Sequence, residues 1–99
     1  MRCRVDLTEN AVDDLLAIVE FIARDNEQRA NAFVQQLRER IEKKLSAFPE
    51  SGTEIGSYRF TVFVGYVVVY SFDEPAEQVR IVLVTEGHRN WRRALEERP

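Results

Sequence analysis

The beginning of the chain changes from an alternating pattern of polar and apolar residues to a helical spacing. Residues 2–7 alternate with a period of two, which is typical of a strand with one buried face. Between residues 12 and 23 the apolar positions recur every three or four residues, which predicts an amphipathic helix. Thr8 can cap the start of this helix, and Asp13 and Asp14 place negative charge near its positive end. We therefore expect a first strand that leads directly into a helix.

A second run of helical spacing follows a short polar break at residues 25–27. Its apolar positions extend from Ala30 to Phe48, and Pro49 ends the pattern. Because two amphipathic helices with so short a connection must share one core, the pattern predicts an antiparallel helical hairpin. Residues 50–57 contain two glycines and show no periodicity, so we expect a surface loop there.

The second half of the chain is rich in β-branched and aromatic residues, which predict three strands at 59–64, 66–72 and 79–85. Gly65 can adopt the positive φ of a tight reversal, and the polar turn at residues 73–77 contains a proline. The strands therefore form an antiparallel meander. A helical hairpin packed on one face of this mainly antiparallel sheet gives a two-layer α+β domain of order β-α-α-β-β-β. We expect one last helical turn near Trp91.

The composition is that of a single folded, soluble domain over residues 1–99. Hydrophobic residues make up 44% and charged residues 31% of the chain, far from the proportions of disordered proteins. Cys3 is the only cysteine, so no internal disulfide can form and we expect a cytoplasmic protein. The longest apolar stretch, residues 60–70, is too short for a membrane helix, which needs roughly 20 residues, so no membrane partner is expected.

Few residues could bind a metal or carry out covalent catalysis. The only cysteine and the only histidine, Cys3 and His88, lie at opposite ends of the sequence, so a zinc site is not expected. We interpret Cys3 as a buried structural thiol rather than a nucleophile. The chain has no glycine-rich phosphate loop. The sequence therefore predicts no metal and no cofactor.

Residues 86–93, which follow the last predicted strand, hold the densest cluster of binding chemistry. The net charge is −3, yet four arginines lie within the last eleven positions. Guanidinium groups grip phosphate or carboxylate in bidentate fashion, and the sole tryptophan, Trp91, offers a flat surface to a partner. The alternative is a solvated helical end, in which the arginines pair with Glu86, Glu96 and Glu97 while Trp91 covers the helical hairpin. Both interpretations stay open at this point.

Taken together, several segments resemble the RelE/ParE superfamily of toxins from type II toxin–antitoxin modules. The resemblance covers nearly the whole chain and is carried by the order and spacing of these segments: Val12-Asp13-Asp14-Leu15 with Ile18, Phe21 and Ile22, then Phe33, Leu37, Ile41 and Leu45, then Phe48-Pro49-Glu50-Ser51-Gly52, Arg59, Gly65-Tyr66-Val67-Val68-Val69-Tyr70 and Gly87-His88-Arg89-Asn90-Trp91. It implies the β-α-α-β-β-β fold and a cognate antitoxin as partner in a hetero-oligomer. Such an antitoxin lays a segment over the hairpin and the sheet, and we expect its contacts at Leu16, Val19, Phe33 and Leu37.

The resemblance also implies one of two activities. RelE-like members cleave messenger RNA in the ribosomal A site with lysines and arginines, whereas ParE-like members inhibit DNA gyrase. The arginine that follows Gly-Tyr in RelE-like chains is Val67 here, and the lysines of the preceding strand correspond to Tyr58 and Phe60. The tyrosine near the C-terminus corresponds to Leu95, so only Arg89 matches the nuclease set.

We therefore expect a gyrase inhibitor that acts by protein binding and not as an enzyme. Its predicted target contacts are the residues of the arginine-rich end together with one arginine of the first meander strand: Arg59, His88, Arg89, Trp91, Arg92 and Arg93. Two alternatives remain. In the first alternative, the chain is a ribosome-dependent endoribonuclease that uses Arg89, His88 and Arg59 on messenger RNA. In the second, it is a non-toxic remnant that only binds its antitoxin.

Overall fold

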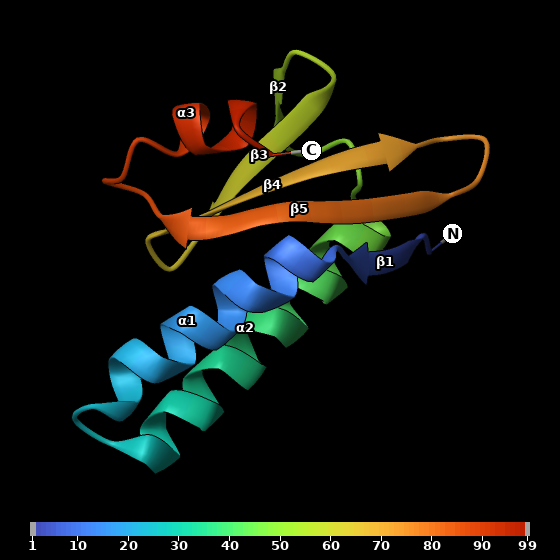
Figure 1. Ribbon diagram of the computed structural model, residues 1–99. Helices are drawn as coiled ribbons and strands as arrows, with labels where there is room; N and C mark the ends of the chain where they lie inside the picture. The colour runs from blue at the N-terminus through green and yellow to red at the C-terminus, as the bar shows by residue number, and fades with distance from the viewer. Residues whose placement is uncertain (1, 99) are drawn as a thin grey trace.

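A five-stranded sheet lies between a helical hairpin and a short C-terminal helix in the computed structural model, which describes residues 2–98 (Figure 1). In chain order the elements are β1 (Arg4–Leu7), α1 (Glu9–Ala23), α2 (Glu27–Ala47), β2 (Thr53–Ile55), β3 (Tyr58–Phe63), β4 (Tyr66–Asp73), β5 (Gln78–Glu86) and α3 (Trp91–Glu96). The predicted α+β class and the order of its main elements are confirmed. The structure also contains a strand that was not predicted, β2, and α3 forms a separate layer on one face of the sheet.

Both long helices begin at the side-chain caps that local chemistry favours. The hydroxyl oxygen of Thr8 accepts a hydrogen bond from the Ala11 amide at 3.2 Å, and the Asn26 side-chain oxygen accepts one from the Arg29 amide at 3.0 Å. α2 ends at Ala47, two residues before Pro49. The predicted helical hairpin is therefore confirmed, with α2 beginning slightly earlier than its apolar pattern.

The sheet has the order β1-β5-β4-β3-β2, with β1 parallel to β5 and every other pair antiparallel. The reversal between β3 and β4 uses Val64 and Gly65, which both adopt positive φ, at 50° and 84°. β5 contains a bulge opposite β4, because Val69 pairs with Leu83 whereas Tyr70 pairs with Ile81. The extra residue is Val82.

The expectation of a simple surface loop at residues 50–57 is wrong, because Thr53–Ile55 forms the edge strand β2 beside β3. Arg59 holds this strand in place through its guanidinium, which donates to the Gly52 carbonyl at 3.0 Å and pairs with Glu54 at 3.0 Å. Gly56 turns the chain between the two strands with φ at 59°. Three residues between glycines are too few to show a period of two, so the sequence pattern could not reveal this strand.

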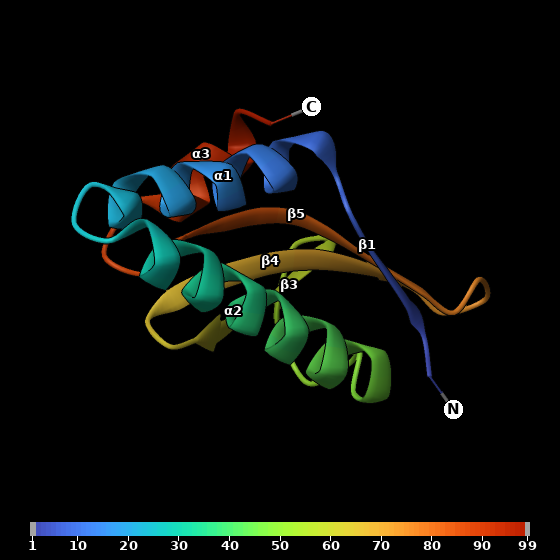
Figure 2. The same ribbon diagram turned by 90° about the horizontal axis from the view of Figure 1, so that it is seen from below.

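Two separate hydrophobic clusters cover the two faces of the sheet. On the hairpin side, α1 and α2 pack on Val68, Tyr70 and Val84. On the other side, α3 packs on a second cluster that centres on Val67 and Val69. Figure 1 shows the hairpin below the sheet and α3 above it, and Figure 2, which looks from below, shows the hairpin in front of the sheet with α3 partly hidden behind α1. The architecture therefore has three layers rather than the expected two.

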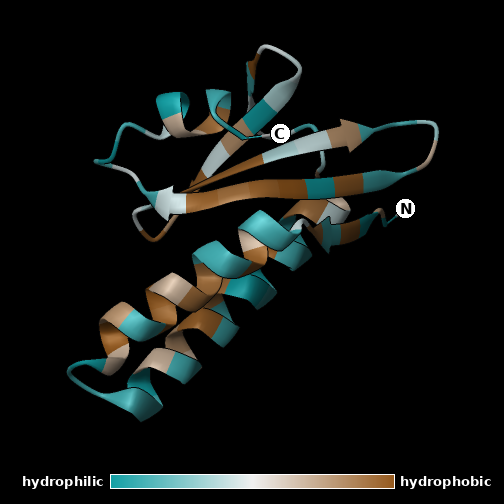
Figure 3. Cartoon of the chain, in the orientation of Figure 1, coloured by the Kyte–Doolittle hydropathy of each residue, from teal (hydrophilic) through white to brown (hydrophobic). Residues whose placement is uncertain are grey.

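Within the first cluster, Tyr70 is completely buried and its hydroxyl oxygen accepts a hydrogen bond from the Gly52 amide at 2.9 Å. Figure 3 shows the corresponding pattern along the chain, with hydrophobic stretches in the middle of β5 and alternating hydrophobic and hydrophilic turns in both long helices. Among residues 2–98, neither of the long helices has the length and apolar character needed to span a bilayer.

Candidate functional site

The arginine-rich end begins where β5 stops and the chain turns toward α3. The Gly87 amide donates to the Gly65 carbonyl at 2.9 Å, and a Cβ atom on Gly87 would lie only 3.2 Å from the same oxygen. This contact fixes the loop that carries the next residues. The Glu86 carboxylate lies near the side chains of both following residues, 3.0 Å from His88 Nε2 and 3.7 Å from Arg89 Nε.

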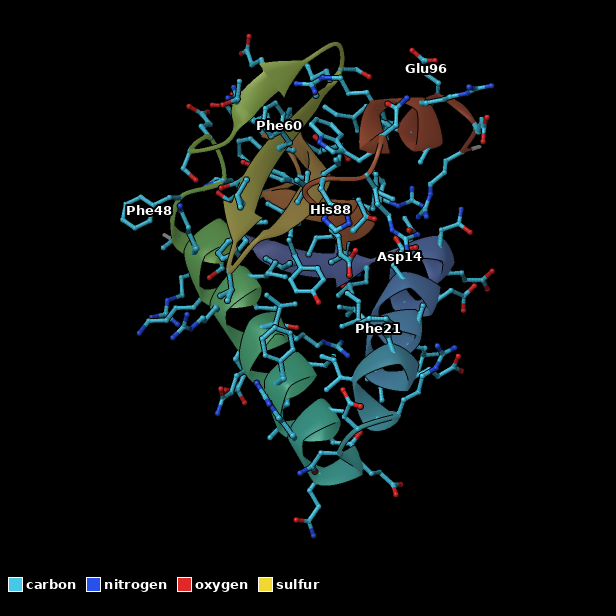
Figure 4. The ribbon with its side chains drawn as sticks, turned by 90° about the vertical axis from the view of Figure 1, so that its left-hand side faces the viewer. Asp14, Phe21, Phe48, Phe60, His88 and Glu96 are labelled. Carbon is cyan, nitrogen blue, oxygen red and sulfur yellow. The ribbon has the colours of Figure 1, made fainter. Side chains whose placement is uncertain are left out.

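His88 and Arg89 are nevertheless well exposed, with side-chain exposures of 80% and 70%. Figure 4 looks onto this end of the molecule, with His88 in front of the sheet, α3 above it and Phe21 of α1 below it. Exposed ion pairs of this kind contribute little to stability. These two side chains are thus available to a partner without unfolding of the loop.

α3 presents two further arginines but hides the tryptophan. Trp91 is only 5% exposed and its ring lies 4.8 Å from the Phe60 ring, centroid to centroid. Arg92 covers it from outside, with the guanidinium carbon 4.3 Å from the Trp91 centroid. Arg93 is exposed and lies 3.7 Å from Glu97. We use the name arginine surface for the exposed side chains of His88 and Arg89 in the loop after β5 and of Arg92 and Arg93 on α3.

Two expectations about Trp91 are corrected by this arrangement. Trp91 was expected to contact a target directly, but in the structure it is buried between α3 and the sheet. The alternative, that it covers the helical hairpin, is also wrong, because α3 lies on the opposite face of the sheet. Its role is to anchor α3, so the arginines on α3 depend on it for their position.

Arg59 lies away from the arginine surface. It pairs with Tyr70 in the sheet register, whereas Glu86 pairs with Tyr66 at the opposite end of β4. Tyr66 and Tyr70 are four positions apart along β4, which is roughly 14 Å. Its side chain is 24% exposed and is bound to Glu54 and to two backbone carbonyls. The structure therefore gives Arg59 a structural role and does not bring it together with His88 and Arg89.

A cavity of about 320 Å³ lies beneath Arg89, between the end of the sheet and α1. Its lining mixes charges and aromatic groups, including Arg24, Glu86, Tyr66 and the exposed Phe21. Burial raises the pKa of the Tyr66 hydroxyl, and the nearby Glu86 carboxylate adds to the rise. A tyrosine shifted in this direction keeps its proton at neutral pH, so it can donate a hydrogen bond here but does not act as a base.

A second surface feature is an apolar groove of about 270 Å³ on the outer side of the helical hairpin. Val12, Leu16 and Val19 of α1 line one side, and Val34 of α2 lies opposite. Leu16 is 54% exposed and Val12 is 40% exposed, which is unusual for large apolar residues so close together.

Only half of the predicted antitoxin contacts lie in this groove. Leu16 and Val19 line it, but Leu37 is 2% exposed in the core, and Phe33 packs against Tyr66 with ring centroids 5.8 Å apart. Leu37 is thus wrong as a direct contact because the sheet covers it. Val12 was missed, although its spacing from Leu16 and Val19 places the three on a strip beside the core-facing residues.

The chain matches one family model, described as "ParE toxin of type II toxin-antitoxin system, parDE", over residues 5–91. The chain belongs to the ParE toxin family. The match extends from the second residue of β1 to the first residue of α3. A comparison with curated protein sequences yields no match.

Solved structures share the ParE-family fold at low sequence identity. The chromosomal ParDE system from P. aeruginosa gives a TM-score of 0.71 at 18% identity, over 86% of this chain and 96% of that one. The RelBE2 toxin–antitoxin complex from Mycobacterium tuberculosis gives 0.70 at 18% identity, over 87% and 92%. The isolated E. coli RelE toxin gives 0.58 at 16% identity, over 95% and 96%.

In this ParE-family chain, the four residues compared with RelE-like nuclease positions lie in one place. Tyr58, Phe60, Val67 and Leu95 all belong to the hydrophobic cluster under α3. Val67 is 3% exposed, and the Phe60 ring packs on Trp91. These four positions therefore hold apolar and aromatic side chains that pack against one another, and none of them carries a cation.

No group of acidic, histidine or cysteine side chains suited to a metal ion occurs within residues 2–98. Cys3 is a free, partly buried thiol that packs against the hairpin-side core, and it precedes β1 rather than lying within it.

Proposed function

We propose that this ParE-family toxin inhibits DNA gyrase in the cytoplasm by protein binding through the arginine surface, and that a cognate antitoxin neutralises it by covering the hairpin groove. His88, Arg89, Arg92 and Arg93 supply the target contacts. Arginines at such a surface form bidentate bonds to carboxylates, which provides both affinity and orientation.

The observation that carries this proposal is the apolar filling under α3. Tyr58, Phe60, Val67 and Leu95 occupy the positions where RelE-like toxins need cations and a tyrosine, and here they pack around Trp91. Arg89 alone cannot activate a nucleophile and also protonate a leaving group, because the two roles need groups in opposite protonation states. Binding of a protein target is the activity that the remaining surface supports best.

The antitoxin part of the proposal rests on the groove. Val12, Leu16, Val19 and Val34 form an apolar strip along two helices, and an amphipathic helix is the partner that fits such a strip. The solved ParDE and RelBE relatives are themselves toxin–antitoxin complexes, which favours a hetero-oligomer with an antitoxin for this chain.

The experiment is a supercoiling assay with purified chain and purified DNA gyrase. We expect supercoiling to fall as the chain is added, and the Arg89→Ala/Arg92→Ala variant to need at least about tenfold more protein for the same effect, since two charge contacts are lost. Arg29→Ala, which removes an exposed arginine at the far end of α2, is the matched control and keeps full inhibition.

A ribosome-dependent cleavage assay distinguishes the alternatives. Codon-positioned cuts in messenger RNA, with supercoiling unaffected, would replace the proposal with a RelE-type nuclease. If the chain affects neither supercoiling nor messenger RNA but binds the antitoxin encoded beside it, it is a non-toxic remnant.

A further inference from the structure

A basic hollow that holds an exposed phenylalanine lies at the C-terminal end of α2, apart from both surfaces described above. It has a volume of about 410 Å³ and is lined by Arg2, Arg40, Lys43, Lys44, Ala47 and Phe48. Phe48 is 66% exposed, and it is the most exposed of the large hydrophobic side chains among residues 2–98. Figure 4 shows Phe48 pointing away from the body of the protein at the end of α2.

The local sequence explains why these groups meet. Residues 40, 43, 44 and 47 are spaced by three, one and three, so they lie on one side of α2. Pro49 stops the helix and leaves Phe48 outside it. The Cys3 amide donates to the Ser46 carbonyl at 2.8 Å, which brings the start of the chain, with Arg2, to the same end of the helix.

The positive charge of the hollow is not neutralised within the described chain. Arg38, on the neighbouring side of α2, pairs with Glu42 at 3.0 Å. Between residues 2 and 98, by contrast, no carboxylate forms an ion pair with Arg2, Arg40, Lys43 or Lys44. Lys44 instead lies over the Phe63 ring at 5.5 Å. Cations near a helix C-terminus are favourable in themselves, but that effect does not explain an exposed phenylalanine among them.

We propose that this hollow binds an acidic segment of a partner protein, with one apolar side chain of the segment seated against Phe48. Carboxylates of the segment pair with the cations at the rim, and the aliphatic stems of the lysines and arginines complete an apolar floor. A partner of opposite charge matches the four unpaired cations on a chain whose net charge is −3. Nucleic acid fits less well, because single-stranded nucleic acid is held by a groove with successive aromatic platforms and many phosphate contacts, whereas this hollow offers one phenylalanine and four cations.

The hollow is independent of the proposed toxin activity. The hairpin groove uses α2 residues such as Val34 and Arg38, whereas the hollow uses Arg40, Lys43 and Lys44 on another side of the helix. If the chain does not inhibit gyrase, this inference is therefore unaffected. If the hollow does not bind an acidic peptide, the gyrase proposal is unaffected.

The probe is a fluorescein-labelled peptide of twelve residues that repeats Glu-Asp-Leu, measured by fluorescence anisotropy with the full chain. Two companion peptides replace every leucine by serine, or every acidic residue by its amide. We expect the wild-type chain to bind each companion peptide at least about tenfold more weakly than the Glu-Asp-Leu peptide. The Arg40→Gln/Lys43→Gln and Phe48→Ser variants should bind the Glu-Asp-Leu peptide at least about tenfold more weakly than the wild type does. Arg29→Gln on the same helix is the matched control and changes the affinity less than about twofold.

Circular dichroism of each variant checks that the fold is retained. Lys43→Arg keeps the positive charge, so this variant should bind the Glu-Asp-Leu peptide as the wild type does if the effect is electrostatic. Equal affinity of the wild type and the Arg40→Gln/Lys43→Gln variant for the Glu-Asp-Leu peptide overturns the inference. Tighter, competing binding of a single-stranded thymidine oligonucleotide of equal charge also overturns it, and assigns the hollow to nucleic acid instead.

Discussion

The carboxylate of Asp14 in α1 and the guanidinium of Arg98 after α3 lie 2.8 Å apart, although 84 positions separate them in the chain. Both also bind the edge of β5. Asp14 accepts a hydrogen bond from the Val84 amide at 2.9 Å, and Arg98 donates one to the Val82 carbonyl at 2.7 Å. β1 pairs with β5 only as far as Ile81, so these backbone groups lie beyond the neighbouring strand. The pair thus joins all three layers and covers an open sheet edge.

We expect Asp14→Asn and Arg98→Ala each to lower the free energy of unfolding by about 1–3 kcal/mol, because both side chains are mostly buried and bind backbone groups. A double-mutant cycle from urea denaturation should show that the two losses do not add. The control is Arg93→Ala, which breaks an exposed 3.7 Å pair with Glu97 and should cost less than about 1 kcal/mol. Equal losses for the Arg93 and Arg98 variants would contradict this role.

Gly52 and Tyr70 offer a second test of packing. A Cβ atom on Gly52 would lie 2.5 Å from the Tyr70 hydroxyl and 2.9 Å from the Phe60 carbonyl, so Gly52→Ala should lower the free energy of unfolding by about 1–3 kcal/mol. Tyr70→Phe removes the closest of these contacts but also leaves the Gly52 amide without its acceptor. The penalty of Gly52→Ala should therefore be smaller in the Tyr70→Phe background. Strictly additive losses would show that the hydroxyl does not limit the space.

Trp91 and Arg89 separate stability from target binding. Trp91→Ala removes a buried indole and should lower the free energy of unfolding by about 3–5 kcal/mol. Arg89→Ala removes a side chain that is 70% exposed and should change it by less than about 0.5 kcal/mol. Thermal denaturation of both variants, alongside the gyrase assay, tests the difference. If the Trp91→Ala protein is stable but fails to inhibit gyrase, Trp91 contacts the target directly.

Which parts of this molecule were predictable depends on the range of the interactions that form them. The helical hairpin follows from apolar residues three and four positions apart, and the meander follows from β-branched runs around Gly65, so local sequence was enough. The bulge at Val82, the parallel pairing of β1 with β5 and the third layer depend on contacts between distant segments. For the same reason the residue types of the arginine surface were visible, whereas the burial of Trp91 and Leu37 was not.

The stability of the chain should depend on Asp6 at acid pH. Hydrogen bonds from Arg4 and from Gln78 lower the pKa of the Asp6 carboxyl below its ordinary value, and the Gln78 contact joins β1 to β5 at 2.7 Å. A lowered pKa in the folded state means that the contribution is fully present above the ordinary pKa near 3.9. It is lost as the pH falls through the folded-state value.

Urea denaturation between pH 7 and pH 3 measures this effect. The wild type should lose stability more steeply toward acid pH than Asp6→Asn, so the difference between the two curves should shrink as the pH falls toward 3. The difference is small because the Asp6 side chain is 40% exposed. Parallel curves over the whole range would show that Asp6 has the same pKa in the folded and unfolded states.

Substitutions at Leu16 and Leu37 distinguish a residue that contacts the antitoxin from a residue of the core. Leu16 is 54% exposed and lines the groove, whereas Leu37 of α2 is buried in the core between the hairpin and the sheet. Leu16→Lys should leave the free energy of unfolding nearly unchanged, but it should weaken antitoxin binding by at least about tenfold, because a charge replaces an apolar anchor. Leu37→Ala should do the opposite, with a loss of about 2–5 kcal/mol in stability and little direct effect on the binding surface.

Ala17→Lys is the matched control for Leu16→Lys, since it adds the same charge to the next position of α1 but outside the groove. Isothermal titration of each folded variant with the antitoxin encoded beside the toxin gene measures the affinities. If Ala17→Lys weakens binding as much as Leu16→Lys, added charge on α1 is responsible and the groove is not the docking surface. If only Leu16→Lys does so, the apolar strip of Val12, Leu16 and Val19 is the part of the hairpin that the antitoxin covers.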